Sequence, residues 1–235
     1  CHVEIITKKG CINYALFKHS VLCHTFLPYR NPVKDARIWK HTQGKVNLAI
    51  QGKELFNPDK GDYEYAGLPY GAKARLILAH INSQAIKQQS PVVQIEDSMS
   101  AFMKKIGLNV TGEKNTVQVD LQFTEAIKQD NEFNLWFPKD SNQRILWKSE
   151  IHLGDKYFKS LMSHAIPLDE RALASLSHNA LALDIYAWLA QRLHRVSPNK
   201  PQFITWAAIK DQFGRGYKEM YKFKQKFRQT LKTTL

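Results

Sequence analysis

The chain has 235 residues, a mean hydropathy of −0.42 and a formal net charge of +13, with a pI near 9.6. A hydrophobic content of 43% is typical of a folded protein, and no apolar run approaches the roughly 20 residues that span a bilayer. The charge predicts an acidic partner, which is nucleic acid, a membrane surface or an acidic protein. Three cysteines are an odd number for a secreted disulfide framework, which favours a reducing cytoplasm.

The N-terminal third contains short runs of β-like character. One such run covers residues 46–50, and the sequence Asn-Pro-Asp-Lys-Gly at 57–61 is typical of a turn. We therefore expect a β-rich extension over residues 1–70.

A first helical unit follows. The sequence predicts a helix over 75–86, ended by Pro91, and an extended piece over 92–95. Ser98 is placed to cap a second helix over 99–106.

The next stretch lacks an expected element. An alternating strand at 117–123 follows almost directly, so the third helix of the unit is absent near 112/113. The alternatives are a natural deletion and residues missing between Gly112 and Glu113, and we favour the second. Beyond it, we expect a long hairpin over 133–147 and a simple connection over 165–170.

A second unit has the same order of elements. We predict a helix over 181–193 with Ser177 as its cap, and then an extended piece over 202–204. Thr205 caps a brief helix that Gly214 closes. In both units the interval from cap to glycine is nine residues.

The last predicted helix begins at Gly216 or Tyr217 and is strongly basic. Residues 210–235 hold eight Lys or Arg against two acidic residues, and so carry +6 of the net charge of +13. Apolar residues at spacings of three and four predict one buried face, formed by Met220, Phe223, Phe227 and Leu231. A helix anchored in this way, with Lys, Arg and Gln on its other face, is suited to a polyanion, and nucleic acid is the leading candidate.

Helix, short strand, helix, tight turn and third helix is the order of a helix-turn-helix unit with a wing. The sequence therefore predicts an α+β fold with two winged-helix units in tandem. The domains are the extension 1–70, a first unit 71–150 and a second unit 151–235.

In such a unit the third helix enters the major groove of DNA. The predicted DNA-binding residues are Arg215, Tyr217, Lys218, Lys222, Gln225, Lys226, Arg228 and Gln229. Lys222 and Lys226 are suited to phosphates, while Arg215 and Gln225 have bidentate geometry for guanine and adenine. The alternative is an ordinary solvated lysine face.

The aromatic residues have less specific interpretations. Tyr217 and Tyr221 either stack on sugar or pack at the edge of the core. The tryptophans are expected in the core rather than on bases, namely Trp136, Trp147, Trp188 and Trp206.

The sequence predicts no metal, no cofactor and no catalytic site. The spacings of Cys1, Cys11 and Cys23 fit no zinc pattern, because no Cys-x₂-Cys pair exists. The chain has no His-x-His pair, no phosphate loop around Gly44 and Gly52, and no nucleophile beside a base. We therefore expect the protein not to be an enzyme.

Several longer strings match a known family, namely the residues at 23–30, 67–80, 97–103, 135–138, 165–172 and 176–194. Together they resemble the plasmid-encoded RepA replication initiators of Gram-negative bacteria. The resemblance covers roughly Val21 to the end of the chain, and the stretch 165–195 is its most specific part. The main departure is the segment missing after Gly112, where family members carry a further helix.

The resemblance implies winged-helix domains and a cytoplasmic protein that binds double-stranded DNA at direct repeats of a plasmid origin. It also implies origin opening and recruitment of the host replication initiator and helicase. In related initiators a homodimer represses its own promoter, which bears on plasmid copy control. Two alternatives stay open: a winged-helix transcriptional repressor, and a protein-interaction module with a basic docking face.

Overall fold

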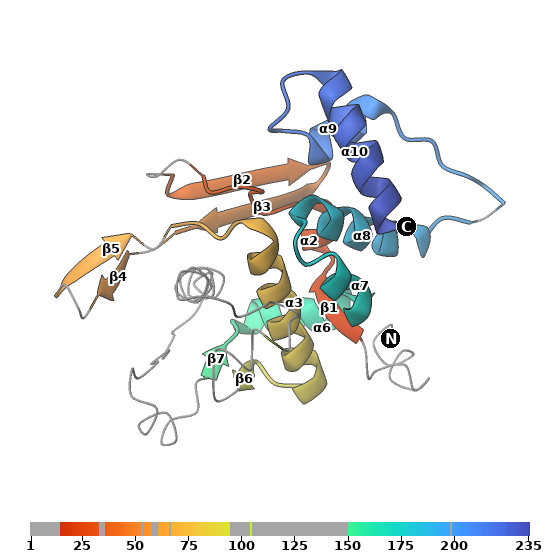
Figure 1. Ribbon diagram of the computed structural model, residues 1–235. Coiled ribbons are helices and arrows are strands. Elements are labelled where there is room, and N and C mark those ends of the chain that lie inside the picture. Colours follow the sequence, from red (N-terminus) through yellow and green to blue (C-terminus); the bar gives the residue numbers. More distant parts are fainter. Residues whose placement is uncertain are drawn as a thin grey trace.

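The computed structural model describes residues 15–32, 36–52, 54–57, 61–65, 67–94, 104, 150–197 and 199–235 (Figure 1). Within these residues, helices and two-stranded antiparallel sheets form an α+β fold, as the sequence predicted. The elements predicted over 99–106, 117–123 and 133–147 lie outside the described residues. So does the question of a missing helix at 112/113.

A long-range strand pair lies at the centre of the first core. Strand β1 (Ala15–His19) is buried along its whole length and pairs antiparallel with β8 (Ala165–Asp169), with Phe17 opposite Pro167. The prediction of a simple connection over 165–170 is therefore wrong, because most of this segment is a strand. The two paired strands lie about 150 residues apart in the sequence, so no local sequence pattern predicts the pairing.

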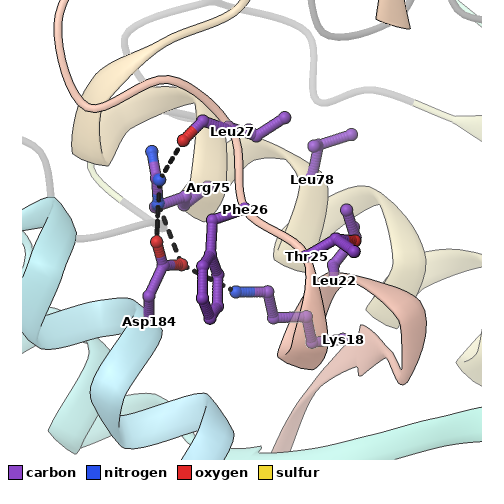
Figure 2. A pocket seen from close by; sticks show the side chains of 8 residues that line it. All are labelled: Lys18, Leu22, Thr25, Phe26, Leu27, Arg75, Leu78 and Asp184. Carbon is purple, nitrogen blue, oxygen red and sulfur yellow. Dashed lines mark hydrogen bonds and ion pairs between the residues drawn. The ribbon is translucent and has the colours of Figure 1, made fainter. Parts of the chain in front are cut away.

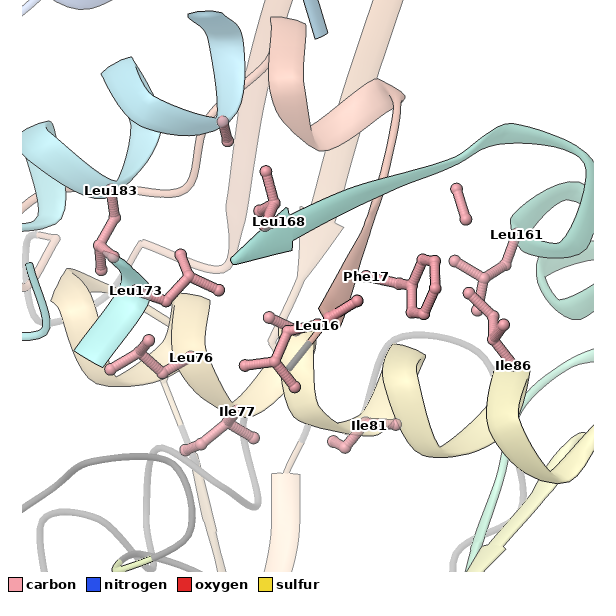
Figure 3. Close-up of a cluster of buried hydrophobic side chains, with 14 of the residues drawn as sticks. Leu16, Phe17, Leu76, Ile77, Ile81, Ile86, Leu161, Leu168, Leu173 and Leu183 are labelled. Carbon is pink, nitrogen blue, oxygen red and sulfur yellow. The ribbon is translucent and has the colours of Figure 1, made fainter. Parts of the chain in front are cut away.

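Helices α3 (Gly71–Gln88) and α6 (Asp155–His164) pack around this strand pair. Figure 3 shows the side chains of α3 and β1 meeting in one apolar cluster, with Leu161 of α6 beside Phe17. Phe17 and Leu161 are fully buried. The predicted helix 75–86 is confirmed within α3, and Gln89, which has a positive φ of 50°, is its C-cap.

Helix α8 (Ala180–Leu193) is shared by two cores. Its Leu183 belongs to the first core, whereas its Ile185 belongs to a second core, formed with α9 (Trp206–Phe213) and α10 (Met220–Thr234). Such a helix is buried on two sides, which explains the near-continuous apolar run in its sequence.

The start of α8 differs from the prediction. Ala182 N donates to Asn179 Oδ1 at 3.2 Å, so Asn179 is the N-cap. Ser177 lies instead in the turn that closes α7 (Glu170–Ser175), where its amide donates to Ala174 O. Ser177 and Asn179, two positions apart, each suit a cap, and the length of that turn decides between them.

A buried ion cluster joins the halves of the chain (Figure 2). Asp184 of α8 accepts hydrogen bonds from Arg75 of α3, the shortest at 2.7 Å, and from Lys18 of β1 at 3.2 Å. Arg75 also donates to the carbonyl oxygens of Leu27, Pro28 and Gly71. All five guanidinium N–H groups are thus used, as burial of this group requires.

Two hairpins and one further strand pair complete the sheets of the described residues. Strands β2 (Ile38–Gln43) and β3 (Val46–Gln51) confirm the predicted strand at 46–50. Strands β4 (Glu54–Asn57) and β5 (Asp62–Tyr65) flank the predicted turn, where Gly61 has a φ of 66°.

The third pair, β6 (Val92–Gln94) and β7 (Glu150–His152), confirms an extended segment at 92–94. A short helix, α2 (Val21–His24), follows β1. By contrast, the extended piece predicted at 202–204 forms no strand, and the Phe203 side chain is 98% exposed.

Candidate nucleic-acid interface

Helices α9 and α10 are joined by a tight turn. As predicted, Thr205 caps α9, with Ala208 N donating to Thr205 Oγ1 at 3.2 Å. The following helix starts later than predicted, at Met220 with Glu219 as its N-cap. Residues 215–219 form the turn between the two helices, and Tyr217 N donates to Gly214 O there at 2.9 Å.

Gly214 closes α9 as predicted, but not through a left-handed backbone, since its φ is −108°. A Cβ on Gly214 would lie 2.7 Å from Lys210 Cγ and 2.8 Å from Phe223 Cδ2. Glycine is required there because α9 and α10 approach closely.

The buried face of α10 is aromatic. Phe223 and Phe227 are at most 3% exposed, and Phe227 packs edge-on against Trp206 at 5.9 Å and beside Phe213 at 5.4 Å. Met220 and Leu231 are half-buried against the same core, so the predicted stripe is confirmed. Thr230, which is 2% exposed, also belongs to this face, although its polarity gives no sign of it in the sequence.

The outer face of α10 is cationic. The helix contains five basic residues and no acidic one. The predicted residues on this helix are all exposed, namely Lys222, Gln225, Lys226, Arg228 and Gln229. Glu219, which precedes the helix, pairs with Lys222 at 3.2 Å on the surface.

One flank of α10 is ordered by Trp206. Arg228 and Lys224 lie over the Trp206 ring at 5.1 and 5.6 Å from its centroid. A shallow groove of about 600 Å³ runs along this flank, lined by Tyr221, Lys224, Gln225, Arg228, Gln229, Leu231 and Lys232. Sequence reasoning omitted Lys224, because its contact with Trp206 joins residues 18 positions apart.

The predicted residues of the turn lie differently. Lys218 is exposed, whereas Tyr217 is half-buried with its ring 5.7 Å from that of Phe223. Tyr221 is 64% exposed, so of the two tyrosines only Tyr217 packs at the edge of the core. Arg215 is exposed but donates to two backbone carbonyls of β2, Lys40 O at 3.3 Å and Thr42 O at 3.1 Å.

Of the four tryptophans expected in the core, two are described. Trp188 is buried, and Trp206 packs against the second core, so both lie where the sequence predicted. Trp136 and Trp147 lie outside the described residues.

The residues considered for a metal are dispersed or not described. Cys23 is buried, and burial raises the pKa of its thiol to about 11. His24 Nε2 contacts Gln191 Nε2 at 2.7 Å. Cys1 and Cys11 lie outside the described residues. Within the described part of the chain, no group of three or more His, Cys, Asp or Glu residues could hold a metal ion.

Among the described helices, none is both long and apolar enough to cross a bilayer.

Comparison with known proteins gives one family. Residues 113–208 match the family model described as plasmid encoded RepA protein, and this segment ends inside α9, so that α10 follows it. Neither the curated proteins nor the solved structures contain a significant match. This match, over less than half of the chain, links it to plasmid-encoded RepA proteins and so to the initiation of plasmid replication. The match confirms the resemblance predicted from the sequence and identifies residues 113–208 as a segment of the plasmid-encoded RepA family.

Proposed function

We propose that the protein is a plasmid replication initiator that binds double-stranded DNA at repeated sequences of the origin. Binding promotes opening of the adjacent duplex and recruits the host initiator and helicase. The observation that carries the proposal is the last helix: α10 is fixed by Phe223 and Phe227 and presents five basic residues with no acidic one. The family match supports the role in replication.

The dimensions of α10 suit the major groove. Fifteen residues make a helix of roughly 22 Å, and the groove of B-DNA, about 12 Å wide, admits one α-helix. Lys222 and Lys226 would neutralise phosphates on one side, while Gln225 and Gln229 face outward between the flanks and offer amides to base edges. Because α10 is held by a core, its side chains meet DNA with little ordering cost.

The fold around α10 is proposed as one of two winged-helix units in tandem. In the second unit, α8, α9 and α10 are the three helices, and the close approach at Gly214 sets the angle of the helix-turn-helix. In the first unit, α3 corresponds to α8, and β6 follows it. The protein acts through binding energy and duplex distortion, without catalysis or a cofactor.

The test is fluorescence anisotropy with a labelled duplex that carries tandem repeats from the parent plasmid's origin, beside a scrambled duplex, over 50–200 mM salt. Neutralisation of six phosphates gives a log–log slope of about −5. We expect this slope and a clear preference for the repeats. Weak binding to both duplexes with a shallow slope would contradict the proposal and favour the protein-interaction module.

A repressor without initiation activity is the closer alternative. It needs one palindrome and a dimer, whereas an initiator binds direct repeats and helps open an A·T-rich tract. Permanganate reactivity of thymines beside the repeats separates the two, because unpaired thymines become reactive only when the duplex opens.

A further inference from the structure

The β2–β3 hairpin lies beside the turn that precedes α10 (Figure 1). Its strands are joined by a two-residue turn, Gly44-Lys45, with Gln43 opposite Val46. Gly44 has a φ of 58°, as the first residue of such tight hairpin turns requires. The hairpin thus carries a defined tip with an exposed lysine.

One face of the hairpin is fixed to the second core through Phe26. Trp39 Nε1 donates to Phe26 O at 2.9 Å, and Phe26 N donates to His41 Nδ1 at 2.7 Å. The Phe26 ring in turn stacks on Phe213 of α9 at 4.8 Å. The hairpin is therefore linked to the aromatic core of α10 through Phe26, while its own Trp39, Leu48 and Ile50 pack in a separate cluster with Leu27, Leu68 and Ala74.

Arg215 adds a second attachment. Its guanidinium donates to Lys40 O and Thr42 O at 3.3 and 3.1 Å, and thereby bridges the turn before α10 to strand β2. A guanidinium engaged with two carbonyls in this way is held in place and is less available to a guanine edge.

The opposite face of the hairpin is mostly polar, although it also carries the exposed Ile38 and Ala49. Lys40, Thr42, Asn47 and Gln51 alternate with the inward residues and are exposed. Residues 36–52 contain Arg37, Lys40 and Lys45 and no acidic residue. Arg37 pairs with Glu54 at 2.8 Å, whereas Lys40 and Lys45 have no ion pair within the described part of the chain.

We infer that the β2–β3 hairpin is a second DNA-contacting arm, in which Lys40 and Lys45 bind phosphates flanking the groove occupied by α10. Arg215 is a positioning residue that holds the arm against the turn. This inference rests on the proposed function of α10. Its partner is the sugar–phosphate backbone, because the exposed face offers cations and short polar groups but no aromatic side chain to stack on a base.

The first test compares salt slopes. Lys40→Ala with Lys45→Ala removes two phosphate contacts, so the log–log slope should become shallower by about 2. Equivalently, the loss of affinity between 50 and 200 mM salt should shrink about tenfold. The matched control is Lys156→Ala with Lys159→Ala, two exposed lysines of α6 with the same change of charge, which should leave the slope unchanged.

The outcomes separate this inference from the proposed function. An unchanged slope in the hairpin variant, with binding lost in a Lys222→Ala, Lys226→Ala variant, overturns the arm and leaves α10 as the DNA-binding element. Wild-type protein that binds neither duplex overturns the proposed function itself. Normal DNA binding by the hairpin variant, with altered sedimentation, would instead assign this face to a second copy of the chain.

The second test addresses Arg215. Arg215→Ala should weaken binding to the repeats and to the scrambled duplex by the same factor, because positioning carries no sequence information. It should also reduce the effect of the Lys40 and Lys45 substitutions when the changes are combined. Loss of preference for the repeats would contradict the positioning role. It would instead support the predicted contact of Arg215 with a base.

Discussion

Arg75 and Asp184 form a buried ion pair between two helices that are 109 residues apart in the chain. Their side chains are 3% and 1% exposed, and Nη2 of Arg75 lies 2.7 Å from Oδ2 of Asp184. The same guanidinium donates to the carbonyls of Leu27 and Pro28, which follow α2, and to that of Gly71 at the start of α3. The pair therefore fixes the position of α3 relative to α8.

Asp184→Asn should strongly destabilise the protein. The substitution leaves the charges of Arg75 and Lys18 buried without a counter-ion, which costs about 3–5 kcal/mol of unfolding free energy. Urea unfolding followed by circular dichroism measures it. The control is Asp169→Asn, which breaks the exposed ion pair with Arg171 and should change little, so equal losses in both variants would refute the role of the buried cluster.

Phe227→Ala should remove a central part of the second core. The ring is 3% exposed and lies against three other aromatic rings, so its loss should cost about 3–5 kcal/mol. Gln229→Ala, on the exposed face of the same helix, should cost less than about 0.5 kcal/mol. Thermal unfolding of both variants checks the assignment of the two faces of α10.

Gly214→Ala should push α9 and α10 apart and destabilise their packing. The added methyl group meets Lys210 and the buried Phe223 ring below 3 Å, which we expect to cost about 1–3 kcal/mol and to weaken DNA binding. Gly216→Ala is the matched control, since its Cβ would meet nothing within 4 Å. Similar stability of the two variants would show that the close approach is not what requires glycine at position 214.

Lys222→Glu with Lys226→Glu should strongly weaken DNA binding without unfolding the protein. Both residues are exposed, and reversal of their charges replaces two attractive contacts with repulsion, so affinity should fall by about two orders of magnitude. Anisotropy on the origin duplex gives the affinity, and circular dichroism verifies the fold. Lys156→Glu with Lys159→Glu supplies the same change of charge on α6, and an equal loss there would mean that only net charge matters.

Acid should destabilise the fold through His19. Burial, followed by the nearby His164, lowers the pKa of His19 from 6.5 to about 4. The neutral ring accepts from Val21 N at Nδ1 and contacts Ser160 Oγ at 2.9 Å through Nε2, so protonation at Nδ1 breaks a hydrogen bond. The unfolded chain then binds more protons than the folded one, and unfolding free energy should fall as pH drops from about 6.5 to about 4.

Urea unfolding between pH 7 and pH 5 measures this dependence. Burial also lowers the pKa values of His24 and His41, so these residues contribute with the same sign. His19→Gln should make the dependence shallower without removing it. An unchanged pH dependence would exclude His19 as a source.

Local patterns predicted much of the C-terminal region. The stripe of α10, the Thr205 cap and the closing Gly214 follow from spacing and side-chain chemistry within about 30 residues. Thr230 was missed because a threonine at a core position resembles any solvent-facing polar residue in sequence. The late start of α10 depends on the turn, whose length is set by the packing of Tyr217.

Contacts between distant segments escaped prediction. The pairing of β1 with β8 and the bond of Arg215 to the carbonyls of β2 each join residues about 150 or more positions apart. A basic residue before a basic helix predicts a nucleic-acid contact equally well whether or not a hairpin lies beside it. Only tertiary structure distinguishes a base-contacting arginine from one that holds backbone.

Because α8 supplies side chains to both cores, the two halves of the molecule cannot lose structure separately. A cavity made at Leu183 weakens the helix on which Ile185 supports α10, although the two side chains face different clusters. Substitutions around β1 should thus affect the proposed DNA-binding surface through a loss of folded protein rather than through altered contacts. Exchange of the C-terminal helices between relatives would need α8 to be exchanged with them.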